Sequence, residues 1–208
     1  MSQGPKEIFN KHANSYQERF MYFHLYDDTY DALCKSLKLA ATILEIGCGP
    51  GNITKYLLTQ RPDLNILGID LAENMIDLAK QNCPAASFKV MDAKDILKLE
   101  KKFDAVVCGF CLPYLNKEEV SKVVSDSSQL LNAEGVLYLS AIEDPYTRSG
   151  LETSRDGKDK CYIYYYEESD LHPTLASNNF ELQSVFRKEY QKAEAETDTH
   201  LILIARKK

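Results

Sequence analysis

From residue 41 onward, short apolar runs rich in β-branched residues alternate with stretches whose apolar positions recur at helical spacing. The runs predict strands at 42–47, 65–70, 87–92, 103–110 and 135–142. The stretches between them predict helices at 51–60, 73–82 and 117–131. Such alternation is typical of a parallel sheet wrapped by helices, so we expect an α/β fold.

Beyond residue 142 the pattern changes. A polar stretch at 149–160, rich in Ser, Gly, Asp and Lys, is expected to be a loop. A helix near 170–178 and strands at 180–190 and 201–206 follow. The acidic segment 193–199 lies between these two strands and is short enough to be the loop of a long-looped hairpin.

Residues 1–40 predict two helices that share an aromatic-rich face. Its members are Phe9, Tyr16, Phe20, Phe23, Tyr26 and Tyr30. A stripe of this kind usually packs into a core, but one that precedes the first strand could instead cover the open edge of a site. A second group of tyrosines could form another wall of that site or simply alternate between the faces of a strand: Tyr162, Tyr164, Tyr165 and Tyr166. We expect an aromatic-lined cap built from 1–40 and 143–170.

A chain of 208 residues allows one domain. We divide it into a helical cap at 1–40, a core at 41–142 and a region of loop, helix and hairpin at 143–208. The net charge of -6 and the lack of a basic segment argue against a nucleic-acid partner. No apolar run approaches the ~20 residues that cross a bilayer, and the first residues hold no apolar signal core, so we expect a cytoplasmic protein with no membrane partner.

Six cysteines are too few for a disulfide scaffold in a chain of this length and fit a reducing compartment. Cys108 and Cys111 have the spacing of a metal or redox pair. Because no second pair and no nearby histidine would complete four zinc ligands, we expect ordinary strand cysteines and no metal.

The most informative stretch runs from Ile43 to Asn52, where a buried strand enters a glycine-rich turn and then a helix. Gly47, Gly49 and Gly51 allow tight turns with positive φ and let a ligand lie against bare backbone. Asp70 ends the next strand, where a carboxylate can accept hydrogen bonds from both ribose hydroxyls of a nucleoside. The alternative role for Asp70 is a helix N-cap.

The spacing of the glycines bears on which nucleoside is bound. A dinucleotide site uses G-x-G-x-x-G, whose third glycine keeps the helix close to the sheet. Asn52 stands at that third position, which disfavours NAD or FAD, and the chain has no G-x-x-x-x-G-K-[ST] phosphate loop.

Five segments together resemble the class I S-adenosylmethionine-dependent methyltransferases. They are LEIGCGPGN (44–52), GIDLAENMI (68–76), VMDA (90–93), FDAVVCGFCLPYL (103–115) and LLNAEGVLYLS (130–140). Each is weak alone, but five in the family's order and spacing are a strong signal. The resemblance implies a doubly wound, Rossmann-like, seven-stranded and mostly parallel sheet of order 3-2-1-4-5-7-6 with an antiparallel seventh strand. It also implies N-terminal helices that cap the site.

The same resemblance implies S-adenosylmethionine as cofactor, bound at the carboxyl ends of strands one, two and four. Asp70 would hold the ribose, Met75 would flank the adenine, and Asp92 would meet the adenine amino group. Tyr16 lies in a segment, HANSY (12–16), that resembles the family's cover over the cofactor. The full implied cofactor-binding set is Tyr16, Glu45, Gly47, Cys48, Gly49, Gly51, Asp70, Leu71, Met75, Asp92, Ala93, Phe110 and Leu112.

One departure from the family concerns the acceptor. Members that methylate exocyclic amines of bases or glutamine amides carry [DNS]-P-P-[YF] at the end of the fourth strand. Here the stretch from Phe110 to Tyr114 keeps Pro113 and Tyr114 but lacks the polar lead residue and the first proline. We therefore expect a small-molecule acceptor, methylated by direct displacement in a dry, aromatic-lined pocket of a monomer or homodimer.

No general base stands out. The weak candidates for a catalytic role are Glu143, Asp144, Tyr114 and His12. We expect a surface or capping role for His172, and expect His200, just before the last predicted strand, to lie away from the chemistry. Two alternatives stay open: a nicotinamide-dependent oxidoreductase, and a protein that binds S-adenosylmethionine or another nucleoside without catalysis.

Overall fold

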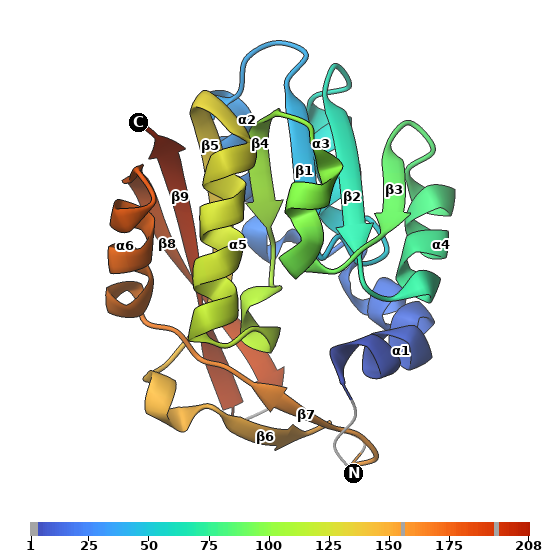
Figure 1. The fold of residues 1–208 in the computed structure, drawn as a ribbon. Coiled ribbons are helices and arrows are strands. Elements are labelled where there is room, and N and C mark those ends of the chain that lie inside the picture. The colour runs from blue at the N-terminus through green and yellow to red at the C-terminus, as the bar shows by residue number, and fades with distance from the viewer. Residues whose placement is uncertain (1–3, 155–156, 194–195) are drawn as a thin grey trace.

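The computed structural model describes residues 4–154, 157–193 and 196–208. Its centre is a seven-stranded sheet of order β3-β2-β1-β4-β5-β9-β8 (Figure 1). The strands are β1 (Thr42–Ile46), β2 (Asn65–Asp70), β3 (Ser87–Val90), β4 (Phe103–Cys108), β5 (Leu131–Glu143), β8 (Phe180–Ala193) and β9 (Glu196–Lys207). The first five run parallel, and β9 is antiparallel to both β5 and β8. The predicted fold class and strand order are confirmed, with β8 and β9 as the sixth and seventh strands of the prediction.

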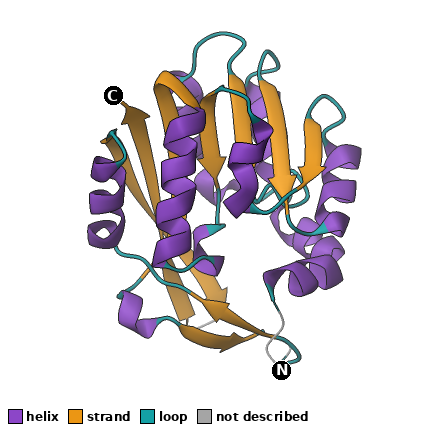
Figure 2. Ribbon diagram, in the orientation of Figure 1, coloured by secondary structure: helices purple, strands orange, loops and turns teal. Residues whose placement is uncertain are grey.

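Helices cover both faces of this sheet (Figure 2). They are α1 (Pro5–Phe20), α2 (Asp27–Ser36), α3 (Asn52–Gln60), α4 (Glu73–Asn82), α5 (Lys117–Leu130) and α6 (Glu168–Ser177). Short 3-10 helices lie at η1 (His24–Tyr26), η2 (Ala93–Leu99), η3 (Leu112–Tyr114) and η4 (Tyr146–Arg148). Among the described residues, no helix is long and apolar enough to span a membrane.

The core has two layers because successive side chains of a strand point to opposite faces. Leu44 and Ile46 of β1 belong to the layer that also holds Val123 of α5. Ile43, between them, belongs to the layer that holds Leu57 of α3. Both faces of β1 are therefore buried, which explains why its sequence is a continuous apolar run rather than an alternating one.

The region after β5 differs from the prediction. The stretch at 149–160 was predicted as a loop, but it contains β6 (Gly150–Thr153) and the first residue of β7 (Lys160–Ile163), which pair antiparallel as a second sheet. Residues 155–156 of that stretch lie outside the described residues. The acidic segment at 193–199 is not a long loop either, because β8 ends at Ala193 and β9 already begins at Glu196. Residues 194–195 of that segment lie outside the described residues. The two strands of this C-terminal hairpin are thus longer than their apolar patterns suggested.

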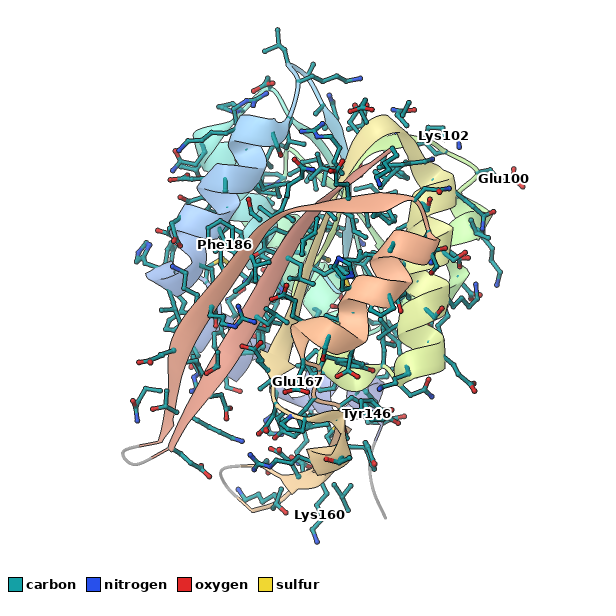
Figure 3. The ribbon with its side chains drawn as sticks, turned by 90° about the vertical axis from the view of Figure 1, so that its left-hand side faces the viewer. Glu100, Lys102, Tyr146, Lys160, Glu167 and Phe186 are labelled. Carbon is teal, nitrogen blue, oxygen red and sulfur yellow. The ribbon has the colours of Figure 1, made fainter. Side chains whose placement is uncertain are left out.

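Two pieces that are distant in sequence lie beyond the carboxyl ends of the parallel strands. Figure 1 shows α1 and the β6–β7 hairpin at this same end of the molecule. In Figure 3, Tyr146 and Lys160 lie at the end that carries the hairpin, while Glu100 and Lys102 lie at the opposite end. In open α/β sheets ligands bind outside the carboxyl ends of the strands, so this end is where a site is expected.

Candidate functional site

The turn between β1 and α3 brings bare backbone to the carboxyl end of the sheet. Gly47 has φ +67° and Gly51 has φ +86°, a region that other residues rarely adopt. A Cβ at Gly47 would come within 3.2 Å of the Cβ of Cys111, and one at Gly51 within 3.4 Å of the Cα of Ala79. The glycines therefore keep the turn tight against α4 and against the segment that follows β4.

Asp70 braces this glycine turn from the end of β2. Its Oδ2 accepts a hydrogen bond from the backbone N–H of Gly49, and its Oδ1 accepts one from the N–H of Ala72, both at 2.9 Å. Burial raises the pKa of Asp70, while these N–H groups act in the opposite direction. A carboxylate has about four lone-pair sites, so both oxygens can still accept hydrogen bonds from a ligand.

Glu45 is a buried acid in β1, beneath the same turn. Its Oε2 accepts a hydrogen bond from the hydroxyl of Thr54, whereas its Oε1 has no partner among the described residues. Burial raises the pKa of Glu45 to about 8. An unpaired polar atom at this depth is unfavourable and marks a place where a ligand could supply the missing partner.

A cavity of about 280 Å³ opens at the glycine turn. Nine members of the implied cofactor-binding set line it: Tyr16, Gly47, Gly49, Asp70, Leu71, Met75, Asp92, Ala93 and Phe110. The remaining four, Glu45, Cys48, Gly51 and Leu112, are buried and do not line this cavity. We call this space the smaller cavity.

Asp92 and the start of α5 lie close together on the smaller cavity. Asp92 caps η2 by accepting a hydrogen bond from the N–H of Lys94 at 2.9 Å. The Nζ of Lys94 donates to Glu119 at 2.9 Å and lies 3.8 Å from Asp92. Lys94 therefore balances the charge of two carboxylates that face the same space.

A larger cavity of about 740 Å³ lies on the other side of four aromatic residues. Phe9, Tyr16, Phe110 and Tyr114 line both cavities, and we call them the aromatic partition. The ring of Phe9 meets Tyr114 edge-on at 5.1 Å and Tyr16 edge-on at 5.9 Å. A reacting group in one cavity can therefore reach the other only past these rings.

Phe110 reaches the partition through an unusual backbone conformation. Its φ is +56°, which is uncommon for a bulky residue and typical of functional sites. Its N–H donates to the hydroxyl of Ser140 on β5 at 2.7 Å, which holds the turn. This turn ends β4 at Cys108, two residues before the predicted end.

The lining of the larger cavity corrects the predicted cap. Its aromatic side chains come from residues 1–40, as expected, and also from Tyr56, Phe110, Tyr114 and Tyr190. The β6–β7 region lines it with other residue types: Glu152, Thr153, Ser154, Asp159, Cys161 and Ile163. None of the tyrosines at 162 and 164–166 lines it, and Tyr166 instead packs in the core.

His200 was expected to lie away from the chemistry, but it lies in the wall of the larger cavity. Its Nδ1 is 2.6 Å from the hydroxyl of Tyr26, and its ring stacks on Tyr190 at 4.8 Å. Burial lowers the pKa of His200 to about 4. His200 and Ile202 lie two positions apart in β9, so their side chains share one face of that strand, which begins at Glu196 rather than at the predicted residue 201. This two-residue spacing is the sequence signal that could have placed His200.

The four weak catalytic candidates separate into two pairs. Glu143 accepts two hydrogen bonds from Arg187, each at 2.7 Å, and Asp144 pairs with Arg148; neither acid lines either cavity. Tyr114 belongs to the aromatic partition, and burial raises its pKa well above the ordinary value, so its hydroxyl keeps its proton.

His12 of α1 lines the larger cavity, and its Nε2 is 2.6 Å from Oδ2 of Asp159. His172, by contrast, is exposed on α6. Cys111 lines the smaller cavity and Cys108 is buried in β4. Across the described residues, no three His, Cys, Asp or Glu side chains gather as a metal site would require.

Comparison with known proteins agrees with this geometry. Residues 43–135 match the family model of a methyltransferase domain. Over 112 residues the chain is 33% identical to malonyl-[acyl-carrier protein] O-methyltransferase from Acetivibrio thermocellus, a match that covers 53% of this chain and 38% of that protein. The matches cover between 37% and 65% of the lengths of several curated relatives.

Two solved structures share the fold. A SAM-dependent methyltransferase from Methanosarcina mazei aligns with TM-score 0.72 at 22% identity, over 85% of this chain and 96% of that one. Magnesium protoporphyrin IX methyltransferase from Synechocystis PCC 6803 with bound SAM aligns with TM-score 0.68 at 19% identity, over 98% of this chain and 95% of that one. At these identities the likeness concerns the fold.

Proposed function

We propose that the chain is a class I S-adenosylmethionine-dependent methyltransferase that transfers a methyl group from S-adenosylmethionine to a small molecule held in the larger cavity. The observation that carries this proposal is the aromatic partition, which separates two cavities with different linings. The smaller cavity has the glycine turn and the carboxylates of Asp70, Asp92 and Glu119. The larger has aromatic walls interspersed with charged and polar side chains. Donor and acceptor sites of a direct transfer must adjoin in this way.

The residues of the smaller cavity fit the cofactor. In this proposal Asp70 accepts hydrogen bonds from the ribose hydroxyls, and Met75 and Leu71 flank the adenine. Asp92 accepts a hydrogen bond from the adenine amino group, and the backbone of Gly47 and Gly49 faces the rest of the cofactor. The fit rests on the lining of this cavity: the bare backbone of Gly47 and Gly49, and the carboxylates of Asp70 and Asp92.

The bound cofactor supplies a methyl group on a positively charged sulfur, so it brings its own leaving group. The chain then has to align the acceptor with that methyl group, and alignment of this kind can contribute ~7–11 kcal/mol. Aromatic faces stabilise a nearby cation and exclude water. The aromatic partition therefore provides a suitable environment for the transition state, in which the positive charge on sulfur is dispersed.

The acceptor we propose is small because of the space that would hold it. A volume of about 740 Å³ falls in the usual range of ~300–1,000 Å³ for small-molecule sites. The net charge of -6 disfavours nucleic acid. The name of one structural neighbour, a magnesium protoporphyrin IX methyltransferase, also points to a small molecule.

Thermal melting tests the cofactor site. S-adenosylhomocysteine at a hundredfold excess over its dissociation constant should stabilise the chain by ~2.7 kcal/mol, roughly 5–10 °C, and NAD should not. Asp70→Ala should lose most of that shift, whereas Asp77→Ala, an exposed carboxylate on α4, should keep it. A shift with NAD alone would favour the oxidoreductase alternative. No shift with either ligand would contradict the proposed site.

Transfer of labelled methyl groups to a panel of small acceptors separates an enzyme from a binding protein. Turnover to S-adenosylhomocysteine that depends on the added acceptor supports the proposal. Binding of the cofactor without any such turnover would favour the non-catalytic alternative.

A further inference from the structure

His12 and Asp159 form a hydrogen-bonded pair at the larger cavity, and no step described so far uses them. We infer that His12, oriented by Asp159, takes a proton from the acceptor, and that the acceptor is accordingly an alcohol or a phenol. This inference rests on the proposed function. His12 would be a catalytic residue, and Asp159 a positioning residue.

The place of His12 along α1 puts it beside the aromatic partition. Phe9 lies three residues before it and Tyr16 four residues after it, and both line the two cavities. His12 lines the larger cavity and not the smaller one. The helix is distorted at His12 itself, with φ −106° and ψ +15°. An imidazole at this position lies on the acceptor side of the partition.

Asp159 is held firmly enough to orient an imidazole. Its side chain is only 2% exposed, whereas that of His12 is 35% exposed. Its backbone N–H donates to the hydroxyl of Ser154 at 3.0 Å, which fixes the end of the β6–β7 connection. Lys11 donates to both carboxylate oxygens at 2.8 Å. Hydrogen bonds from Lys11 and His12 lower the pKa of Asp159, so its carboxylate is charged at neutral pH.

This arrangement decides which nitrogen of His12 can accept a proton. Since an ionised carboxylate is only an acceptor, Nε2 must carry the hydrogen that it donates to Asp159. Nδ1 then keeps its lone pair, and among the described residues it has no hydrogen-bond partner. His12 thus offers an unpaired ring nitrogen, with the tautomer fixed by Asp159, at the acceptor cavity.

Several other titratable groups on this cavity are less suited to the role. His24 lies 2.8 Å from Asp27 through its Nδ1, but its side chain is 77% exposed to solvent. Burial raises the pKa values of Tyr16 and Tyr114, which keep their protons, and lowers that of His200 to about 4, which makes it a weak base. Glu152 and Asp198 are both paired with Lys192. Arg19 and Lys55 are cations and cannot accept a proton.

The need for a base narrows the acceptor class. A carboxylate reaches neutral pH already ionised and requires no proton removal, whereas a hydroxyl keeps its proton. An ammonium acceptor would also need a base, but it would bring a second positive charge next to Lys11, which already shares Asp159. A neutral hydroxyl avoids that repulsion.

In the transfer to an acceptor ROH, the O–H bond breaks and the proton passes to Nδ1 of His12. The oxygen electron pair forms the new bond to the methyl carbon, while the bond from that carbon to sulfur breaks and leaves its electron pair on sulfur. The products are the methyl ether, S-adenosylhomocysteine and a protonated His12, which returns the proton to solvent.

Nitrogen NMR of histidine-labelled protein tests the pair without turnover. In the complex with S-adenosylhomocysteine at pH 8, His12 should show a protonated Nε2 and an unprotonated Nδ1, and Asp159→Asn should abolish that preference. Adding 2-naphthol should shift the Nδ1 signal of His12 and leave exposed His172 unchanged. The inference is overturned if His12 carries its proton on Nδ1, or if 2-naphthol fails to bind or leaves Nδ1 unmoved.

Methyl transfer to matched acceptors gives a second test. The unaltered chain should methylate 2-naphthol in preference to 2-naphthoate. His12→Gln should lower kcat by about 10²–10⁴-fold while keeping the melting shift with S-adenosylhomocysteine, and His172→Gln should change neither. Loss of the melting shift in the unaltered chain would count against the proposed function. If the melting shift with S-adenosylhomocysteine is retained but the chain prefers 2-naphthoate, the proposed role of His12 is wrong and the proposed function stands. The same conclusion follows if the shift is retained and His12→Gln keeps full activity.

Discussion

At the scale of single residues, Glu45 carries a carboxyl whose two oxygens have different surroundings. One accepts a hydrogen bond from Thr54 and the other has no partner among the described residues. Burial disfavours the charged form, which explains why the pKa rises to about 8. At neutral pH the folded chain therefore holds a proton on Glu45 that the unfolded chain has released.

This difference predicts a pH-dependent stability. Between the ordinary pKa of 4.5 and about 8, the folded chain binds more protons at Glu45, so the free energy of unfolding should fall as pH rises through that range. The slope for one proton is at most ~1.4 kcal/mol per pH unit. Glu45→Gln removes the titratable group and with it this pH-dependent contribution to the free energy of unfolding. Its stability relative to the unaltered chain should thus rise by about 1–3 kcal/mol from pH 5.5 to pH 7.5, measured by urea denaturation without cofactor.

A flat difference over those two pH units would mean that Glu45 is ionised in the folded chain. Asp77→Asn serves as the matched control, since that carboxylate is exposed on α4 and the variant keeps Glu45. Its stability relative to the unaltered chain should therefore stay nearly constant between pH 5.5 and pH 7.5.

Single residues also show how far sequence reasoning reached into the site. Gly47 and Asp70 could be located because a glycine turn and a strand-end acid are local features of the chain. The partners Asp159 and His12 could not be joined, since they are 147 positions apart and meet only through the packing of the hairpin over α1. His200 was misplaced for a similar reason, because its position depends on pairing with Ile142 of β5.

At the scale of elements, the start of α5 is tied to the smaller cavity. Asn116 accepts a hydrogen bond from the N–H of Glu119 at 2.9 Å, and Glu119 accepts one from the N–H of Asn116 at 3.0 Å. This reciprocal cap satisfies two helix-end donors. Glu119 also binds Lys94 of η2, so the cap positions one side of the cavity.

Removing the cap should therefore weaken the fold without removing the cofactor site. Asn116→Ala should lower the free energy of unfolding by about 0.5–2 kcal/mol, and a loss of 1 kcal/mol lowers Tm by roughly 2–4 °C for a chain of this size. The Tm shift produced by S-adenosylhomocysteine should persist. Glu118→Ala, an exposed neighbour outside the cap, should change stability by less than about 0.5 kcal/mol. Equal losses in both variants would contradict the role of the cap.

Elements also differ in how well their sequences predict them. Strands β1, β4 and β5 were found because each contains an apolar run buried on both faces, whereas the edge strand β3 is short and mostly exposed. The β6–β7 hairpin was missed because its residues are polar and partly exposed, and it is held over the cavity by contacts to other segments, such as that between Asp159 and Lys11. The first part of β9 is an acidic, half-exposed segment. It is still a strand because pairing with β5 and β8 satisfies the hydrogen-bonding groups of its backbone, regardless of which side chains it carries.

At the scale of the whole molecule, α1 roofs both cavities and is held by polar contacts near the surface and by one small apolar cluster, in which Ala13 packs against Met75 of α4. Lys6 pairs with Glu73 at 3.0 Å, Asn10 binds Asn74 at 2.8–2.9 Å, and only Ala13 of the helix is fully buried. Segments with few buried apolar contacts open more easily than the core. A cofactor that contacts α1 should therefore close it.

Hydrogen exchange measures this closure. With saturating S-adenosylhomocysteine, amides of α1 after its first turn should exchange at least tenfold more slowly, and the gain is limited to about 100-fold at a hundredfold excess of ligand over its dissociation constant. Amides at the centre of α5 should change less, because that helix is already packed into the core through Val120, Val123 and Val124. Tyr16→Leu should reduce the protection of α1, since it removes a ring that faces both cavities. If the ligand raises Tm while exchange in α1 stays the same, the helix does not close over the cofactor, and the aromatic partition loses its proposed place between donor and acceptor.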